Sequence, residues 1–378
     1  QSRLTTFRSI SLRKRFLEAP LIVNMKDKDG SGFPPVSVGI INYNGVDALE
    51  RTIDSIYNSD YPSMEILMVD DCSTDGSVAL VREKYPDVAL YEQAQNMGPN
   101  AARNRILNNA KNPIVFVSDN DVSLAPDCLK LLVETMTADS SVGVATPMVL
   151  DADDKEKIYS NGASLHYVCF GIVPLRHTHI PSGLDLSPRT SVCGSGGIML
   201  IRKSAAQAIG GFDEDFIFGY DDGEFTYRIS ASSMKVMQVP SAKIYHIEKT
   251  GRPKNILRRQ IRGRWNLILK AYSFRSLVLL SPALLLFELA QFCFLALKGA
   301  AGEWLRGMGL VAGDFGRIIL KRKKVLLAKK APDNELLTTG EIYMFSSRLG
   351  GGVMVLLKYI MEKLLNAYWL IVRPLLTK

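Results

Sequence analysis

The sequence is poor in histidine, and its cysteines stand far apart. It holds 4 His and 5 Cys among 378 residues. Because no two cysteines are close in sequence, we exclude a zinc knuckle and a disulfide framework and expect a reducing compartment. No long apolar segment follows the basic residues of the amino-terminal arm, so no signal peptide is expected. A glycine-rich, basic segment near the start, which nucleotidyltransferases normally carry, is also missing.

Apolar residues are abundant, and the charge is unevenly divided. Hydrophobic residues make up 47% of the chain, which excludes a disordered protein and is enough for a sizeable core. Residues 251–378 carry 22 Lys and Arg against 7 Asp and Glu, a net +15, whereas residues 1–250 carry a net −7. The basic charges alternate with long apolar runs, which favours an anionic membrane surface over nucleic acid as a partner.

Strand-like and helix-like segments alternate over the first third of the chain. The predicted strands are 36–42, 65–71, 88–93 and 113–121, and helical patterns lie at 47–58, 77–85 and 98–111. This alternation implies crossover connections and an open, mostly parallel α/β sheet with its site at the carboxyl ends of the strands. We divide the chain into a basic arm and linker (1–34), a catalytic domain (35–255) and a basic, apolar helical region (256–378).

Asp119 and Asp121 directly follow a strand-like apolar run. Strand residues alternate between faces, so both carboxylates can point the same way from the edge of the sheet. Two convergent carboxylates at this edge are typical of a site for Mg²⁺ or Mn²⁺, which would bind the phosphates of a substrate. His246 ends another short strand-like run and would suit such a site as a further ligand. The alternatives are a solvated turn for the two aspartates and a half-buried structural role for His246.

Polar residues also follow the first two predicted strands. They are Asn42, Tyr43, Asn44, Asp70, Asp71, Ser73 and Asp75. A carboxylate at the position of Asp70 or Asp71 can accept hydrogen bonds from the base or ribose of a nucleotide. Asp75 has an alternative role as a helix cap, because it precedes the helical pattern 77–85.

Two glycine-containing segments are candidates for close contact with a ligand. Asn96 and Gly98 lead into a helical pattern whose first amides, together with Arg103, would favour a diphosphate. A surface salt bridge is the alternative for Arg103. Gly196 and Gly197 precede a strand-like run and would let the backbone approach a sugar or phosphate, unless they form only a tight turn.

A second acidic segment lies between residues 210 and 228. Its aromatic neighbours imply partial burial, which raises the pKa of a carboxyl group, so one member could act as a general base. If a helix begins near Tyr220, its first turn contains Asp221, Asp222 and Glu224, and helix capping is their alternative role. Arg228 is four residues beyond Glu224, a spacing that permits an ion pair.

In this order, these motifs resemble those of the family 2 glycosyltransferases, which are nucleotide-sugar-dependent inverting enzymes, and especially their rhamnosyltransferase-like members. The similarity extends from Val36 to His246. The motifs that carry it are Tyr43-Asn44, Val69-Asp70-Asp71-Xaa-Ser73-Xaa-Asp75-Gly76, Asn96-Xaa-Gly98 with Ala102-Arg103-Asn104, Asp119-Xaa-Asp121, Gly210-Gly211-Phe212-Asp213-Glu214, Asp221-Asp222-Xaa-Glu224 with Arg228, and His246.

The resemblance implies a GT-A type sheet with a Rossmann-like nucleotide-binding half, and it implies roles for single residues. Asp222 would be the catalytic base, in a motif that departs from the family's Glu-Asp-Xaa-Asp pattern at Asp221 and Glu224. The expected donor-binding residues are Asn42, Tyr43, Asn44, Asp71, Ser73, Asp75, Asn96, Gly98, Arg103 and Asp119. The sugar pocket would contain Gly196, Gly197, Asp221 and Glu224. Mg²⁺ or Mn²⁺ would be held by Asp119, Asp121 and His246.

The basic tail predicts membrane contact. Residues 276–297 form an apolar run that contains one acid, Glu288, and is long enough to span a bilayer. Basic residues precede it, so the positive-inside rule would keep the catalytic domain cytoplasmic. A helix in the membrane plane, or one packed on the protein, is the alternative. Residues 352–376 are predicted to be amphipathic, and the run 321–324 suits either an anionic lipid surface or a solvated face.

We therefore expect an inverting glycosyltransferase at a membrane. It would move a sugar from a nucleoside-diphosphate-sugar to a hydroxyl of a lipid-linked or polysaccharide acceptor. The alternative from another class is a catalytically silent glycosyltransferase-like scaffold or partner subunit. The presence of Asp119, Asp121, Asp222 and His246 argues against a silent protein.

Overall fold

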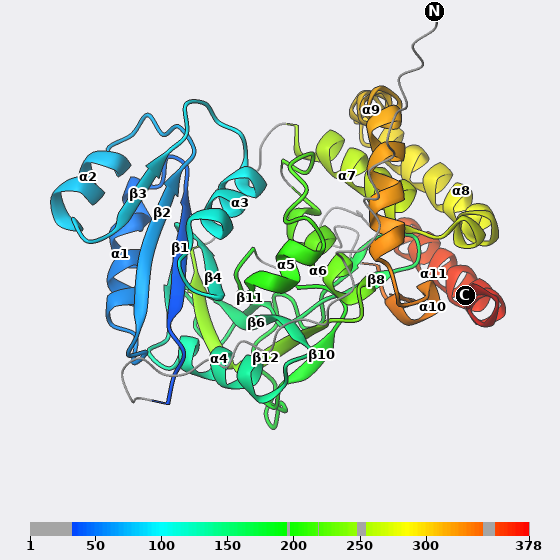
Figure 1. Cartoon of the computed structure of the whole chain (residues 1–378). Helices are drawn as coiled ribbons and strands as arrows, with labels where there is room; N and C mark the ends of the chain where they lie inside the picture. The colour runs from blue at the N-terminus through cyan, green and yellow to red at the C-terminus, as the bar shows by residue number, and fades with distance from the viewer. Residues whose placement is uncertain (1–31, 195–196, 218, 248–254, 343–351, 378) are drawn as a thin grey trace, which may run out of the picture.

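The first half of the chain alternates strands and helices around a parallel sheet (Figure 1). The computed structural model describes residues 32–194, 197–217, 219–247, 255–342 and 352–377, so most of the predicted amino-terminal arm lies outside the described residues. The elements are β1 (Val36–Asn42), α1 (Val46–Tyr57), β2 (Met64–Asp70), α2 (Ser77–Lys84), β3 (Ala89–Glu92), α3 (Pro99–Asn109) and β4 (Ile114–Asp119). β1 pairs in parallel with β2 and β4, and β3 extends the sheet beyond β2. The predicted alternation and the mostly parallel α/β class are confirmed.

The second half extends the same sheet with mixed strand directions. Its main elements are β5 (Val122–Leu124), α4 (Cys128–Ala138), β6 (Val142–Asp151), β7 (Ile158–Ser160), β10 (Arg189–Ser191), β11 (Met199–Arg202), α5 (Lys203–Ala208), α6 (Asp221–Ala231) and β12 (Lys235–His246). The strand order is β10-β12-β6-β11-β4-β1-β2-β3, with β11 antiparallel to both β4 and β6. Helices α1 and α4 pack on one face of this sheet, and α3, α5 and α6 pack on the other.

The carboxyl-terminal region is helical and shares a core with the preceding residues. It consists of α7 (Ile256–Ala271), α8 (Phe274–Leu297), α9 (Ala301–Ala328), α10 (Asp333–Leu336), α11 (Val353–Val372) and the 3₁₀ turn Arg373–Leu376. β13 (Leu337–Thr338) pairs with β8 (Ser164–His166), which in turn pairs with β9 (Gly171–Ile172). One hydrophobic core joins Tyr167 and Tyr227 to Leu267, Phe287 and Trp369. Packing is therefore continuous across the domain boundary that we predict at residue 255.

α8 is the one helix among the described residues that is long and apolar enough to cross a membrane. It has 24 residues, and an 18-residue window within it has a mean hydropathy of 2.0. Its acid, Glu288, faces the protein, where it accepts from Arg264 Nη1 (2.5 Å) and from the indole nitrogens of Trp265 (3.0 Å) and Trp304 (2.7 Å). One side of α8 is thus fixed to α7 and α9.

Candidate active site

Asn42, the last residue of β1, joins the ends of three strands. Its amide nitrogen donates to Asp70 Oδ1 (2.7 Å) at the end of β2 and to Ser73 Oγ (3.1 Å). Its amide oxygen accepts from Asn120 Nδ2 (2.6 Å), just beyond β4. Because Asn42 is buried, this network fixes the three strand ends at one edge of the sheet.

The loops after β1 and β2 are tied to each other. Ser73 Oγ accepts from Asn44 N (2.9 Å), and Asn44 Oδ1 accepts from Thr74 N (2.8 Å). Asn44 has a φ of 48°, in the left-handed region that asparagine adopts more readily than most residues. Tyr43 is 52% exposed on the same loop. The structure thus gathers the residues predicted to bind the nucleoside, and their binding role stays a prediction.

Asp75 has the capping contacts that we weigh as its alternative role. One carboxylate oxygen accepts from Val46 N (3.0 Å) at the start of α1, and the other accepts from Ser77 N (3.0 Å) at the start of α2. Burial would raise the pKa of Asp75, but the hydrogen bonds from Ser77 and Val46 outweigh it and hold the pKa below the usual range. Asp75 therefore positions two helices beside the predicted donor site.

Asp71 binds the loop that leads into α3. Its Oδ1 accepts from Gln93 Nε2 (2.6 Å) and Met97 N (2.8 Å), and its Oδ2 accepts from Gly98 N (2.8 Å). Gly98 has a φ of 87°, which glycine adopts at little cost, and Asn96 is exposed on this loop. Asp71 thus holds the loop in place, and nucleoside binding by Asp71 remains a prediction.

Arg103 connects the two halves of the sheet. Its side chain is only 3% exposed. Nη1 donates to Asp221 Oδ2 (2.6 Å) and to Asn100 Oδ1 (3.0 Å), and Nη2 lies 3.5 Å from Asp119 Oδ1. The alternative of a surface salt bridge is therefore wrong, because folding buries this guanidinium between carboxylates from β4 and α6.

Gly197 brings its backbone close to the same carboxylates. Its nitrogen donates to Asp222 Oδ2 (3.2 Å), and its φ is 73°. A Cβ atom at this position would lie 2.7 Å from Arg103 Nη2 and 3.0 Å from Asp119 Oδ2. The residue must therefore be glycine for steric as well as conformational reasons. Gly196, which we predict beside it in the sugar pocket, lies outside the described residues.

Two carboxyl groups near Arg103, those of Asp119 and Asp222, have raised pKa values. Burial raises the pKa of Asp119 to about 7, with further contributions from Asp121, Asp221 and Asp222, and Arg103 opposes the rise. Burial, followed by Asp221, raises the pKa of Asp222, and Arg103 again opposes the rise. Several negative charges thus share a site with one guanidinium, so the site can accept a proton or a cation.

The acidic residues after Tyr220 lie in the first turn of α6, as predicted. Tyr220 precedes the helix with a φ of 66°. Asp221 Oδ1 accepts from Gly219 N (3.0 Å), and Asp222 Oδ1 accepts from Gly223 N (2.7 Å). Each of these two aspartates has its second oxygen directed to the other half of the site, toward Arg103 and Gly197.

Glu224 is not positioned to line a sugar pocket, and that prediction needs correction. It is fully buried, where its carboxylate accepts from Arg228 Nε (2.7 Å) and Nη2 (2.8 Å). Lys270 Nζ of α7 lies 2.6 Å from Glu224 Oε1. The predicted pair with Arg228 is confirmed. Because two cations enclose Glu224, it joins α6 to the carboxyl-terminal helices instead of facing a substrate.

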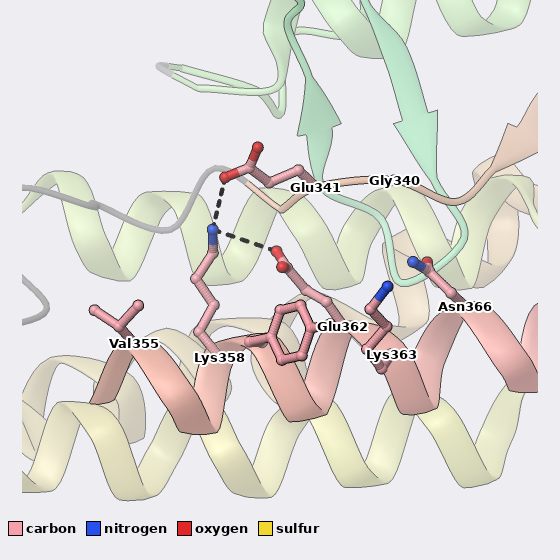
Figure 2. A pocket seen from close by; sticks show the side chains of 8 residues that line it. Gly340, Glu341, Val355, Lys358, Glu362, Lys363 and Asn366 are labelled. Atoms are coloured by element: carbon pink, nitrogen blue, oxygen red, sulfur yellow. Dashed lines mark hydrogen bonds and ion pairs between the residues drawn. The ribbon is translucent and has the colours of Figure 1, made fainter. Parts of the chain in front are cut away.

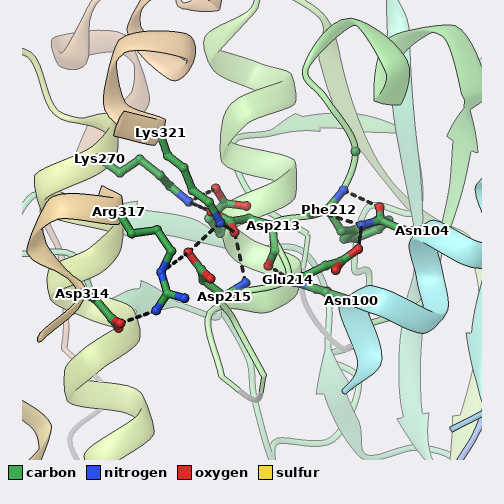
Figure 3. A network of polar contacts seen from close by, with 12 residues as sticks. Asn100, Asn104, Phe212, Asp213, Glu214, Asp215, Lys270, Asp314, Arg317 and Lys321 are labelled. Carbon is green, nitrogen blue, oxygen red and sulfur yellow. Dashed lines mark hydrogen bonds and ion pairs between the residues drawn. The ribbon is translucent and has the colours of Figure 1, made fainter. Parts of the chain in front are cut away.

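The neighbouring Asp213 is held by the same helices (Figure 3). Lys270 of α7 and Lys321 of α9 both contact its carboxylate, and Lys321 Nζ also lies 2.6 Å from Asp215 Oδ2. Burial would raise the pKa of Asp213, but the two lysines outweigh it and hold the pKa well below its usual range. Lys270 has no signal in the sequence, because a single basic residue in a basic tail looks like a solvated charge.

Asp121 and His246 meet where β12 pairs with β5. His246 Nε2 lies 3.7 Å from Asp121 Oδ1, and both side chains are about 15% exposed. Two ligands about 2.1 Å from one ion, at a wide angle, would have this separation, so the pair fits a divalent cation. Among the described residues, no group of three or more His, Cys, Asp or Glu side chains is close enough to enclose a metal ion.

Asn120 contributes to the site, although we do not predict it from the sequence. Its Nδ2 donates to Asn42, and its backbone oxygen accepts from Thr52 Oγ1 (2.9 Å) of α1. The one available signal was its place between Asp119 and Asp121. Asn120 therefore fixes the segment that presents both aspartates.

Comparisons with known proteins agree with this arrangement. Residues 37–210 match the model of the glycosyl transferase family 2, and residues 186–250 match that of the N-terminal domain of galactosyltransferase. The chain is 25% identical over 236 residues to the N-acetylglucosaminyl-diphospho-decaprenol L-rhamnosyltransferase of Mycobacterium tuberculosis, covering 56% of this chain and 76% of that protein. It is 33% identical over 124 residues to the putative teichuronic acid biosynthesis glycosyltransferase TuaG of Bacillus subtilis, covering 32% and 49%.

A solved structure shares the fold. The crystal structure of GalNAc-T7 with UDP, GalNAc and Mn²⁺ aligns with a TM-score of 0.54 and 16% sequence identity, covering 65% of this chain and 49% of that one. At this identity the likeness concerns the fold alone. The matched family model, the named relatives and the shared fold show that the chain carries a glycosyl transferase family 2 domain and is a glycosyltransferase of the GT-A fold.

Proposed function

We propose that the protein is an inverting glycosyltransferase that moves a sugar from a nucleoside-diphosphate-sugar to an acceptor hydroxyl, with a divalent cation. The observation that carries this proposal is the arrangement around Arg103. This buried guanidinium contacts Asp119 from β4 and Asp221 from α6. The residue after Asp221, Asp222, accepts a hydrogen bond from the backbone nitrogen of Gly197. The donor half and the catalytic half of the predicted site are therefore one site.

The donor would lie along the carboxyl ends of β1, β2 and β4. Asn44 and Ser73 shape the loops there, and Tyr43 offers an exposed ring on which a base can stack. Asp71 and Gly98 hold the loop before α3 beside them. This edge is where open α/β sheets bind nucleotides.

The metal ligands in this proposal are Asp121 and His246, with Asp119 close by. The 3.7 Å between Asp121 Oδ1 and His246 Nε2 suits a shared ion. The carboxylate suits Mn²⁺ or Mg²⁺, and the imidazole nitrogen favours Mn²⁺ of the two. When bound, the cation would offset negative charge on the diphosphate leaving group. Arg103, already enclosed by carboxylates, balances their charge and keeps them in position.

Asp222 would act as the general base. Its raised pKa favours taking a proton from an acceptor hydroxyl. The hydroxyl oxygen then bonds to the anomeric carbon as the bond to the diphosphate oxygen breaks. The electron pair leaves with the nucleoside diphosphate, and the anomeric centre inverts. Gly197 N fixes the position of Asp222 Oδ2 for this step.

The acceptor side would be a cavity of about 290 Å³ between the segment that precedes α6 and helices α7 and α9. Ile217 and Gly219 line it next to the catalytic helix, and Leu310 lines it from α9. Arg259 also lines it and forms no ion pair with another described residue. A cavity lined by both apolar side chains and guanidinium groups suits a lipid-linked diphosphate, the acceptor type that the name of the M. tuberculosis relative describes. A polysaccharide acceptor is the other class that we propose.

The location would be the cytoplasmic side of a membrane. The basic carboxyl-terminal helices suit an anionic leaflet, and nucleotide-sugars require the catalytic site to face the compartment that holds them.

The decisive test is the release of nucleoside diphosphate by the purified full-length protein. UDP-, GDP- and dTDP-sugars would be supplied with lipid extract and detergent, in Mn²⁺, in Mg²⁺ or with a chelator. We expect release from one donor that the chelator abolishes. Asp222→Asn should lose this release while binding the nucleotide normally, and the exposed control Asp87→Asn should retain both. Nucleotide binding without release from any donor would instead support the silent scaffold.

A further inference from the structure

Helices α8 and α11 each bury one stripe and expose a second stripe that is almost entirely apolar. On α8 the exposed large side chains recur along one face, at Phe274, Val278, Leu285, Leu286, Leu289 and Leu297. On α11 they include Leu356, Leu357, Ile360, Leu364, Leu370 and Ile371. Soluble proteins rarely expose such continuous apolar surface, so this surface indicates a binding partner.

The two stripes face the same side of the molecule. Leu284 and Phe287 of α8 and Leu365 and Trp369 of α11 enter one core, together with Tyr167. In addition, Tyr368 Oη donates to Leu279 O (2.6 Å), which fixes the two helices side by side. Because both helices bury their inner stripes in this shared core, their exposed stripes form one outer surface. Both helices lie at the end of the molecule opposite β3 (Figure 1).

Cations surround this outer surface, and the acids of the two helices turn inward. Arg275, Lys298 and Arg373 are exposed near the ends of the two helices, and Lys363 is exposed between Leu356 and Leu370 on α11. Glu288 is buried against Arg264. Glu362 of α11 also turns inward.

Figure 2 shows the contacts of Glu362, which lines a cavity of about 420 Å³. It accepts from Ile342 N (2.9 Å) and lies 3.4 Å from Lys358 Nζ, which also contacts Glu341. Among the described residues, the exposed positions of α8 and α11 therefore contain basic residues and no carboxylate.

We propose that α8 and α11 lie in the plane of an anionic membrane, with these stripes at the boundary between headgroups and acyl chains. The apolar stripes supply the buried area, and the four cations supply attraction to anionic headgroups. This inference rests on the proposed function in one respect: with α8 and α11 in the membrane plane, the active site could reach a lipid-linked acceptor. A second copy of the chain fits less well, because two such surfaces would bring cations against cations.

The contacts of α8 favour this orientation over a transmembrane one. Glu288 holds α8 against α7 through Arg264, and Lys270 holds α7 against the buried carboxylates of the catalytic half. A perpendicular α8 would carry the charged side chains of α7 to the depth of the acyl chains, where they are costly. In the plane, only the apolar stripe of α8 meets lipid.

Vesicle co-sedimentation of the full-length protein tests the surface without donor or acceptor. We expect binding to phosphatidylglycerol-containing vesicles and several-fold weaker binding to phosphatidylcholine vesicles. The double variant Leu285→Ser/Leu289→Ser should reduce the partition coefficient at least about tenfold. Tyr57→Ser removes an exposed apolar side chain from α1 instead and should leave binding unchanged.

The depth of three positions on α8 tests the orientation. Cys293 is exposed on the stripe and can carry a fluorophore once Cys72 is replaced by serine. Val278→Cys and Leu285→Cys provide two further positions in a Cys293→Ser background. Quenching by nitroxide lipids should place all three at the same shallow depth. A deep Leu285 position between two shallow ones would show a span and overturn the proposal.

Two further results would also overturn it. One is the absence of vesicle binding by a monomeric protein, and the other is a dimer in light scattering that Leu285→Ser/Leu289→Ser dissolves. Neither depends on catalysis, so failure here is distinguishable from failure of the proposed sugar transfer, which the donor panel measures with detergent present.

Discussion

Lys270 Nζ of α7 lies 2.6 Å from Glu224 Oε1 of α6, two residues beyond Asp222, and it also contacts Asp213. Both Lys270 and Glu224 have side chains that are at most 1% exposed. The carboxyl-terminal helices therefore neutralise carboxylates inside the catalytic half. An ion pair this deeply buried is costly to break, because the partner that remains keeps an uncompensated charge.

We expect Lys270→Met to lower the free energy of unfolding by about 3–5 kcal/mol. The measurement is a urea titration followed by tryptophan fluorescence. All three tryptophans, Trp265, Trp304 and Trp369, belong to the carboxyl-terminal helices, so the signal reports on them directly.

Lys321→Met is the matched control, because Lys321 contacts Asp213 from a side chain that is 36% exposed. Lys321 is more exposed than Lys270, and Asp213 keeps its contact with Lys270 when Lys321 is replaced, so we expect a smaller loss of about 1 kcal/mol. If both variants lost the same free energy of unfolding, the burial of Lys270 would not explain the contribution of its ion pairs to stability.

Because His166 is buried, we expect the stability of the protein to depend on pH. His166 is fully buried, its Nδ1 accepts from Val168 N (3.1 Å), and burial, with a smaller contribution from Arg264, lowers its pKa from 6.5 to about 3. Below pH 6.5 the unfolded chain binds a proton that the folded protein excludes. Stability from this group is therefore complete above about pH 6.5 and falls as the pH drops toward 3, by about 1.4 kcal/mol per pH unit.

The measurement compares the wild type with His166→Gln in urea titrations from pH 7.5 to 4.5. The free energy of unfolding of the variant should fall less steeply with decreasing pH than that of the wild type. The difference in this free energy between the two proteins should therefore shrink as the pH falls. A constant difference at every pH would mean that His166 does not titrate with unfolding.

The sequence predicted the first half of the fold well, because its strands and helices follow the apolar pattern closely. The helix predicted at 47–58 is Val46–Tyr57, and the strand predicted at 65–71 is Met64–Asp70. The strand Val142–Asp151 was missed. Nine of its ten residues are buried, so it has no alternation of apolar and polar residues to recognise.

The site was predictable as a set of residues but not as a set of contacts. Asp119 and Asp222 come together because distant strands and a helix meet, and no local pattern contains this information. The same limit explains the error for Glu224, whose partner Lys270 is far away in sequence. It also explains the basic run 321–324, in which Lys321 turns inward to Asp213.

Arg103 should be essential through its geometry and not only through its charge. We expect Arg103→Lys to lower kcat by about 10²-fold, because an ammonium cannot contact both Asp119 and Asp221 as the guanidinium does. The measurement is the steady-state rate of nucleoside diphosphate release with the donor that the panel of nucleotide-sugars selects. Arg105→Lys is the control on the same helix: among the described residues its side chain contacts Glu92 O and the ring of Tyr91, and the variant should keep its rate.

Gly197 gives the most direct test of how closely the backbone approaches the carboxylates. In Gly197→Ala, the new methyl group would lie 2.7 Å from Arg103 Nη2, at a φ of 73° that alanine rarely adopts. We expect kcat to fall at least tenfold, because either Arg103 or the backbone that donates to Asp222 must move. Gly171→Ala, where the structure shows open space around the Cβ position, should change neither kcat nor stability. A normal rate for Gly197→Ala with unchanged stability would mean that catalysis does not depend on the hydrogen bond from Gly197 N to Asp222. Another residue of the site would then have to be the base.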